Sequence, residues 1–384
     1  MIEQLKQGFI NNYNYEPKHY LDCGGRFEVL GNHTDHNHGI CIAGTCSLKI
    51  NAAVSPRKDK EVHFVSKGFK PFVITLDDLL IHPEEKETSQ GLIRGIARYF
   101  DDHEYKIGGF DIYMESTIPA GAGVSSSAAF ELLIAQIMNV LFNNQEIEKL
   151  YLCKAGHFAE REFFGKKCGL LDQIGVAYGG YTFIDFKNEG SPIIRNLQLD
   201  MTGYHFVVVN SGGSHADLSD MYSQIPMDML SAAHKCGHDF LREGTIEEIE
   251  DKVNVLTASE FNRALHFYGE NERVAKAIEE IENKNIKGLI NLINQSRESS
   301  TNKLKNMYVN EIEGSPLEAC NLIMGASNNE AAVKINGGGF AGSVVSLVPD
   351  TQLDNVVKAA SARYGENNVH IISIRPNGPD FIKE

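Results

Sequence analysis

The chain has 384 residues, a net charge of −15, an apolar fraction of 42% and a charged fraction of 23%. This length exceeds what one small hydrophobic core supports and is typical of two domains of ordinary size. Nucleic-acid backbones are bound by clustered Lys and Arg, so the acidic balance argues against nucleic acid as a partner. It does not exclude a nucleotide, because local dipoles and magnesium can hold a triphosphate.

No segment predicts export or a membrane partner. The opening stretch MIEQLKQGFINNY lacks the apolar core of a signal peptide. The most apolar segment, FELLIAQIMNVLF, contains Glu131, Gln136 and Asn139 and is too short to span a bilayer. Seven cysteines occur without a CxxC pair, which favours reduced thiols and a cytoplasmic enzyme.

The first half of the chain predicts strands with intervening helices. Segments rich in branched and aromatic residues alternate there with Gly, Pro, Asn and charge clusters. A buried helix is expected at about 126–142, which is apolar nearly all round, and a second helix at about 146–164. The expected strands cover 26–31, 40–55, 61–66, 72–76, 110–116, 179–186 and 204–212.

From about Pro226 long helical stretches replace this pattern. The mixed order of elements predicts an α+β protein of two domains with a boundary near residue 195. Helices are expected at 247–267, 271–283 and 353–365, and strands at 331–338, 343–349 and 369–374.

A glycine- and serine-rich loop, STIPAGAGVSSSAAFELL, lies between an expected strand and the helix at 126–142. Gly121 and Gly123 allow close approach of a bulky anion, and the following helix start offers free N–H groups. The loop is not a Walker A motif, because it has no Gly-Lys-Ser/Thr. A plain turn with a serine helix cap is the alternative interpretation.

A second glycine run, INGGGFAGSVVSLV, formally matches GxGxxG through Gly337, Gly339 and Gly342. A dinucleotide site needs a helix after the glycines, whereas SVVSLV predicts a strand. We therefore expect a glycine-lined wall beside a ligand, or a hairpin turn.

Acidic and histidine side chains supply the other candidates. Asp172 lies in the apolar segment CGLLDQIGVAYGG, where a carboxylate must be paired, hydrogen-bonded or functional. Glu160 belongs to AEREFF on an expected helix. The stretch GNHTDHNHG offers three histidines and an aspartate, a set that zinc accepts, so a metal hydrolase is one alternative.

Five segments in order resemble the GHMP kinase superfamily, and within it the galactokinase branch. They are GRFEVLGNHTDHNHG, PAGAGVSSSAAFE, CGLLDQ, NSGGSHADLSDMY and INGGGFAGSVVSLV. The resemblance implies a mixed-sheet N-terminal domain (1–195) similar to ribosomal S5 domain 2. It also implies a ferredoxin-like C-terminal domain (196–384), with the active site in the cleft between them.

The resemblance implies ATP-dependent, magnesium-dependent phosphorylation of the anomeric 1-hydroxyl of a hexose, with galactose as the first candidate. The alternatives are a kinase for a galactose derivative or a uronate, and a non-catalytic sensor that binds sugar and ATP. Sugar and ATP would be the only partners, and the chain would be a monomer or a weak homodimer.

Roles carried over by position form three groups. Asp172 and Arg26 would be catalytic, with Arg26 keeping Asp172 ionised, and Ser127 and Glu160 would hold magnesium. Sugar contacts would come from Asn32, His33, Asp35, Gly169, Asp172 and Tyr222. The phosphates of ATP would lie on Gly121, Ala122, Gly123, Val124, Ser125, Ser126 and Ser127.

Departures from the family pattern lie on the sugar side. Asn32 stands where the family has Glu, and Glu28 stands where it has Asn. Ala43 replaces a proline, His36 replaces a tyrosine, and the paired arginines after Tyr222 are absent. A neutral amide in place of a carboxylate weakens hydrogen bonds to hydroxyls, so Asn32 is expected to influence which sugar binds.

Overall fold

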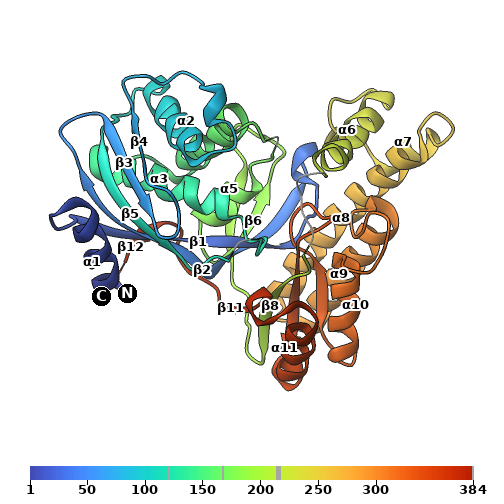
Figure 1. Ribbon diagram of the computed structural model, residues 1–384. Coiled ribbons are helices and arrows are strands. Elements are labelled where there is room, and N and C mark those ends of the chain that lie inside the picture. Colours follow the sequence, from blue (N-terminus) through green and yellow to red (C-terminus); the bar gives the residue numbers. More distant parts are fainter. Residues whose placement is uncertain (120, 167, 213–217, 383–384) are drawn as a thin grey trace.

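The computed structural model describes residues 1–384 except 120, 167, 213–217 and 383–384. Two sheets organise the described chain (Figure 1). The first has the order β12-β1-β2-β5-β3-β4, with β6 beside β2 and β7 beside β6. It is mixed, because β3 runs parallel to β5 while β1 and β2 are antiparallel. Its strands are β1 (His19–Leu30), β2 (Ile40–Pro56), β3 (Glu61–Ser66), β4 (Phe72–Thr75), β5 (Phe110–Ser116), β6 (Tyr181–Asp185), β7 (Ile193–Leu197) and β12 (Asp380–Phe381).

Helices cover both faces of the first sheet, as the alternation of side chains along a strand requires. Ala52 and Val54 of β2 face the main core under α2 to α5, whereas Ala53 packs with Leu5 and Phe9 of α1 on the other face. These helices are α1 (Ile2–Tyr13), α2 (Ser89–Asp102), α3 (Ser126–Phe142), α4 (Lys149–Phe158) and α5 (Leu171–Ala177).

The second sheet is antiparallel, with the order β11-β8-β10-β9. Val207 and Val209 of β8 face α10 and α11, while Phe206 and Val208 face α8 and α9. Its strands are β8 (Tyr204–Asn210), β9 (Ala332–Ile335), β10 (Ser343–Pro349) and β11 (Val369–Ile372). The helices are α6 (Ser219–Lys235), α7 (Ile246–Asp251), α8 (Ala258–Glu282), α9 (Ile286–Ser299), α10 (Pro316–Ala326) and α11 (Asp350–Tyr364).

One apolar cluster joins the two halves. Phe27 of β1 lies 4.6 Å, centroid to centroid, from Phe206 of β8, and the same cluster includes Val274 of α8 and Leu289 of α9. Figure 1 shows β1 and β2 extending toward α8. The chain end also returns to the first sheet, because β12 pairs with β1. A boundary near residue 195 would fall inside β7 and stays a prediction.

Most expected elements are present, and α3 confirms the helix at 126–142. The helix expected at about 146–164 is present, but its second part is not α-helical. There α4 ends at Phe158 and a π-helical segment, Ala159–Phe164, follows. The helix at 247–267 is interrupted, because Thr257 and Glu260 form a capping box that starts α8 at Ala258. No helix within the described ranges is both long and apolar enough to cross a bilayer.

The cluster shared by both halves predicts that they unfold together. Phe27→Ala should lower the free energy of unfolding by about 3–5 kcal/mol, because a fully buried ring is removed. Chemical denaturation followed by circular dichroism measures this loss. Phe69→Ala, at a side chain that is 75% exposed, is the control and should change stability by less than about 0.5 kcal/mol. Two separate transitions in the Phe27 variant, with only one displaced, would contradict a shared core.

Candidate active site

The glycine- and serine-rich loop is anchored in the apolar cluster by two buried side chains. Ala122 and Val124 are 2% and 1% exposed and belong to the cluster that joins the two halves. Gly121 precedes Ala122, and Gly123 lies between Ala122 and Val124. The two glycines have φ of 74° and 68°, a region that favours glycine. Helix α3 begins directly afterwards at Ser126. Exposed backbone and a helix start therefore coincide, which suits an anion.

Protein donors hold the carbonyl groups of this loop. Arg26 Nη1 and Asn336 Nδ2 donate to the carbonyl oxygen of Gly123 at 3.1 and 3.0 Å. Ser343 Oγ donates to the carbonyl oxygen of Gly121 at 3.1 Å. Donors from β1 and from the second half of the chain thus fix the loop.

Asp172, at the start of α5, contacts both β1 and the glycine loop. Its Oδ1 accepts from Arg26 Nε at 2.7 Å, and its Oδ2 accepts from Ser125 Oγ at 2.6 Å. Burial by itself would raise the pKa of Asp172, but Arg26 and Ser125 outweigh it and hold the pKa below its usual value. Asp172 is therefore a partly exposed, ionised carboxylate beside the anion-binding loop. Ser125 was expected to bind the phosphates of ATP. Its hydroxyl hydrogen is donated to Asp172, so it is not free to donate to a phosphate.

Ser127 and Glu160, the two residues expected from the resemblance to hold magnesium, lie together. Ser127 Oγ donates to Glu160 Oε1 at 3.1 Å, and Lys166 Nζ contacts the same oxygen at 2.7 Å. Glu160 is on the π-helical segment, a feature often found at functional sites. A hydroxyl and one carboxylate are hard oxygen ligands, which suit Mg²⁺ when phosphates and water complete its shell.

Gln173 and Lys166 both donate to Glu160, and the sequence analysis identified neither of these roles. Gln173 Nε2 donates to Glu160 Oε2 at 3.0 Å and to Glu131 Oε2 at 2.9 Å. Burial raises the pKa of Glu131, and the nearby Glu160 raises it further. The glutamine of CGLLDQ was the available signal for Gln173, whereas nothing in the sequence pointed to Lys166.

His33 adopts a left-handed conformation with φ of 58° and is only 5% exposed. Its Nε2 lies 2.9 Å from the carbonyl oxygen of Gly338, which can only accept, so Nε2 carries the hydrogen. Burial lowers the pKa of His33 to about 3, so the ring is neutral. Its Nδ1 is then a bare acceptor without a partner among the described residues.

Tyr222 and Gly338 are in direct contact. A Cβ atom at Gly338 would overlap the Tyr222 ring, and that ring lies 5.3 Å from the His33 ring, centroid to centroid. Asp35 is in similar contact with Gly169, where a Cβ atom would overlap Asp35 Oδ2. Four of the expected sugar contacts, His33, Asp35, Gly169 and Tyr222, therefore lie around the signature turn.

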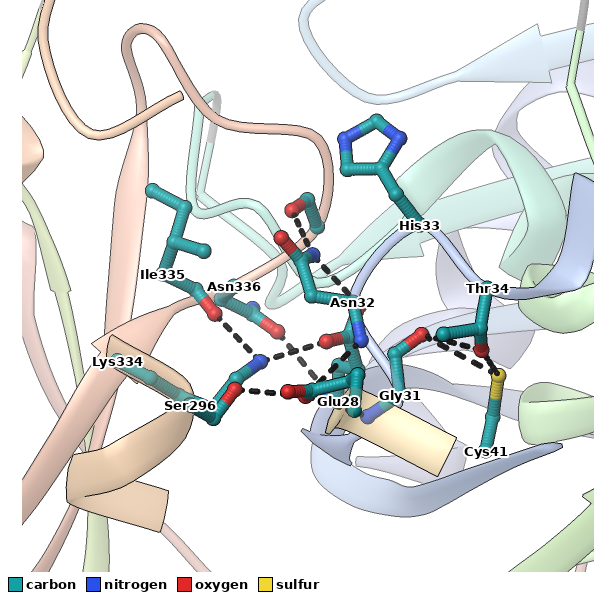
Figure 2. Close-up of polar contacts among 12 residues, drawn as sticks. Glu28, Gly31, Asn32, His33, Thr34, Cys41, Ser296, Lys334, Ile335 and Asn336 are labelled. Atoms are coloured by element: carbon teal, nitrogen blue, oxygen red, sulfur yellow. Dashed lines mark hydrogen bonds and ion pairs between the residues drawn. The ribbon is translucent and has the colours of Figure 1, made fainter. Parts of the chain in front are cut away.

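Asn32 differs from the expectation that it contacts a sugar (Figure 2). It is 1% exposed. Its Nδ2 donates to Glu28 Oε2 at 3.2 Å and to the carbonyl oxygen of Gly337 at 2.8 Å, and its Oδ1 accepts from Asn306 Nδ2 at 2.9 Å. Both amide hydrogens are in use, so the side chain has no free donor for a ligand.

The three histidines of GNHTDHNHG do not form one ligand set. The His33 ring contacts Gly338, and the His38 ring stacks on Phe240 with centroids 3.6 Å apart. Within the described ranges, no group of three or more His, Cys, Asp or Glu side chains is arranged to hold a metal. His215, the histidine of NSGGSHADLSDMY, lies outside the described residues.

Two family models match the chain. Residues 91–180 match the GHMP kinases N terminal domain, and residues 7–56 match the galactokinase galactose-binding signature. Among curated proteins, a galactokinase of Clostridium tetani is 29% identical, with 98% of this chain and 94% of that protein covered. A galactokinase of Lactobacillus helveticus is 26% identical over 94% of each chain.

Solved structures share the fold. A galactokinase of Lactococcus lactis complexed with galactose superposes with a TM-score of 0.85 and 21% identity, over 100% of both chains. A mevalonate kinase superposes with a TM-score of 0.65 and 16% identity, over 93% of this chain and 99% of that one. The mixed α+β architecture of the chain is thus that of the GHMP kinases.

The contact between Gly338 and Tyr222 predicts that position 338 has no room for a side chain. Gly338→Ala should lower the free energy of unfolding by about 1–3 kcal/mol through overpacking, measured by thermal or chemical denaturation. Gly325→Ala in α10 is the matched control, since nothing lies within 4 Å of a Cβ there. It should be neutral or stabilising by up to about 1 kcal/mol. Equal stability of the Gly338 variant and the wild type would contradict this packing.

Proposed function

We propose that this chain, which matches the GHMP kinases N terminal domain over residues 91–180 and the galactokinase galactose-binding signature over residues 7–56, transfers the γ-phosphoryl group of ATP to the anomeric 1-hydroxyl of a hexose. Galactose is the first candidate, because the signature of residues 7–56 and the curated relatives are those of galactokinases. The observation that carries the proposal is the pair of hydrogen bonds that Asp172, at the start of α5, accepts from Arg26 and from Ser125, which is the N-cap residue of α3. A cytoplasmic location and a monomeric or weakly dimeric state stay predictions from the sequence.

Asp172 would orient the attacking hydroxyl and accept its proton. Phosphoryl transfer requires mainly in-line positioning and stabilisation of charge on the equatorial oxygens. Arg26 contributes twice, because it keeps Asp172 ionised and also contacts the loop carbonyl of Gly123. The acceptor hydroxyl and the phosphoryl group would then meet between Asp172 and the loop.

ATP would lie on the exposed backbone of Gly121 and Gly123 and on the first N–H groups of α3. The buried side chains of Ala122 and Val124 leave only their backbone for this role. Ser127 and Glu160 would hold magnesium, which supplies positive charge to the terminal phosphates. Lys166, in contact with Glu160, adds a second cation at the same place.

The groups around the signature turn favour hydroxyls over a carboxylate as the sugar substituent. The neutral His33 leaves its buried Nδ1 lone pair without a partner among the described residues, and the carboxylate oxygens of Asp35 are acceptors. Two acceptors bind hydroxyl hydrogens, whereas they would repel the carboxylate of a uronate. This supports a neutral hexose, and no contact in the described residues favours a non-catalytic sensor.

Asp172→Asn should lower kcat by roughly 10²–10⁴-fold, because the amide neither attracts nor accepts the hydroxyl proton. ATP affinity should stay nearly unchanged. The measurement is an ADP-release assay with galactose, other hexoses, amino sugars and uronic acids as acceptors, together with calorimetric titration of ATP. Asp354→Asn on the exposed face of α11 is the matched control. Normal turnover of the Asp172 variant, or preferred use of a uronic acid, would contradict the proposal.

Loss of Arg26 should move the acid limb of the kcat/KM profile to higher pH. In the wild type, Arg26 helps to hold the pKa of Asp172 below its usual value. In Arg26→Gln, burial dominates and raises that pKa, so Asp172 becomes protonated at a higher pH. The measurement is kcat/KM against pH for the wild type and for Arg26→Gln and Arg26→Lys. The lysine variant should restore part of the shift, and an unmoved limb in the glutamine variant would show that Asp172 does not govern it.

A further inference from the structure

A buried ion pair lies behind the signature turn and outside the set of proposed reacting groups. Lys334 Nζ on β9 contacts Glu28 Oε1 on β1 at 2.6 Å, and the side chains are 0% and 3% exposed. Lys334 also donates to the carbonyl oxygen of Ile335 at 2.9 Å. A buried charge with one partner removed is strongly destabilising, so each of these residues requires the other.

The second oxygen of Glu28 connects this pair to Asn32. Glu28 Oε2 and the carbonyl oxygen of Gly337 both accept from Asn32 Nδ2, at 3.2 and 2.8 Å. These contacts also fix the orientation of the amide, since a flipped amide would place Oδ1 against two acceptors. Figure 2 shows the Asn32 side chain between Glu28 and the segment after β9 that carries Asn336, with the His33 ring directed away.

The same cluster reaches both substrate-binding regions. On the sugar side, Asn306 Nδ2 bridges Asn32 Oδ1 and the carbonyl oxygen of Gly338, at 2.9 and 3.0 Å, and His33 contacts that same carbonyl. On the phosphate side, Asn336 Oδ1 accepts from the backbone N–H of Glu28 at 2.9 Å, and Asn336 Nδ2 donates to Gly123. Residues of the cluster therefore set the turn, the glycine run and the phosphate loop relative to one another.

Helix α8 holds the backbone of Asn32 as well. His266 Nε2 lies 2.9 Å from the carbonyl oxygen of Asn32. Glu270 Oε1 accepts from the N–H groups of Gly31 and Asn32 at 3.1 and 3.3 Å. These contacts fix the backbone that precedes His33, and the left-handed conformation of His33 needs such support in order to persist.

We propose that Glu28, Asn32 and Lys334 act as one positioning unit, in which Glu28 supplies the acid and Asn32 fixes the glycine run beside the sugar without touching the substrate. The family pattern has an acidic residue at position 32. In this chain the acidic residue is Glu28, four residues earlier, and it contacts Lys334. The choice of sugar then belongs to residues such as His33 and Asp35. This inference rests on the proposed function for its kinetic part and on the contacts alone for its stability part.

The test is a double-mutant cycle of Glu28→Asn, Asn32→Glu and the combined variant. Asn32→Glu alone should disturb the cluster in two ways. It buries a second carboxylate beside Glu28, and it removes the donor to the carbonyl oxygen of Gly337. We expect a lower Tm and a fall of at least tenfold in kcat/KM, in the same proportion for every accepted hexose. Glu28→Asn alone should lower Tm because Lys334 loses its partner. The combined variant again has one acid for Lys334, so it should recover the part of both losses that comes from the second carboxylate, while the loss of the donor to Gly337 remains.

Asn32→Ala keeps the test informative if Asn32→Glu does not fold, because it removes the contact to Gly337 without adding charge. Its KM for sugar should rise, its KM for ATP should stay within about twofold, and its relative preference among hexoses should not change. Asn355→Glu, at an exposed position in α11, is the matched control and should leave Tm and kinetics unchanged.

Three outcomes would overturn the proposal. The first is a changed preference among hexoses in either Asn32 variant with Tm unaltered, which would make Asn32 a substrate contact. The second is a combined variant no better than the worse single variant, which would separate Glu28 from Asn32. The third is an unchanged Tm in Glu28→Asn. If the wild type phosphorylates no sugar, the proposed function fails, while the Tm values of the cycle still decide whether the three residues form one unit.

Discussion

The ionised state of Asp172 depends mainly on a buried arginine, with smaller contributions from Lys166 and Ser125. Burial alone would favour the protonated carboxyl group, and Arg26 supplies the opposing charge at 2.7 Å from a position 146 residues away in the chain. Arg26 also contacts the carbonyl oxygen of Gly123. One side chain therefore sets the charge of the proposed acceptor for the sugar proton and the shape of the loop that would hold the phosphates.

The site is precise because rigid elements from both halves carry it. Strand β1 provides Arg26 and Glu28, α3 provides Ser127, and the C-terminal half provides Tyr222 and Asn336. The apolar cluster around Phe27 and Phe206 holds these elements in one core. A positioned site needs such support, because small displacements of reacting groups cost much of the rate.

The sequence predicted the fold class and the regions that carry Asp172 and Ser127, because each of these two lies in a motif with its own local pattern, whereas the role expected for Glu160 came only from the family resemblance. It did not predict the π-helical segment at Glu160, since a change in helical register leaves no periodic signal over six residues. The capping box at Thr257 was readable from residue types alone, yet the apolar pattern across it predicted one helix. The hydrogen bonds that occupy Asn32 could not be predicted either, because its partners Asn306 and Gly337 are 274 and 305 residues away.

By itself the sequence determined which chemical groups are available: a glycine- and serine-rich helix start, a carboxylate in an apolar segment and a signature turn with His33 and Asp35. Residue types and local spacing suffice for these, because helix starts and tight turns are set by neighbours in the chain. Only the tertiary structure decided which groups remain free to meet a ligand. A side chain is free or occupied according to the hydrogen bonds it makes, and the partners of Asn32 and Ser125 come from distant segments that only folding brings to them.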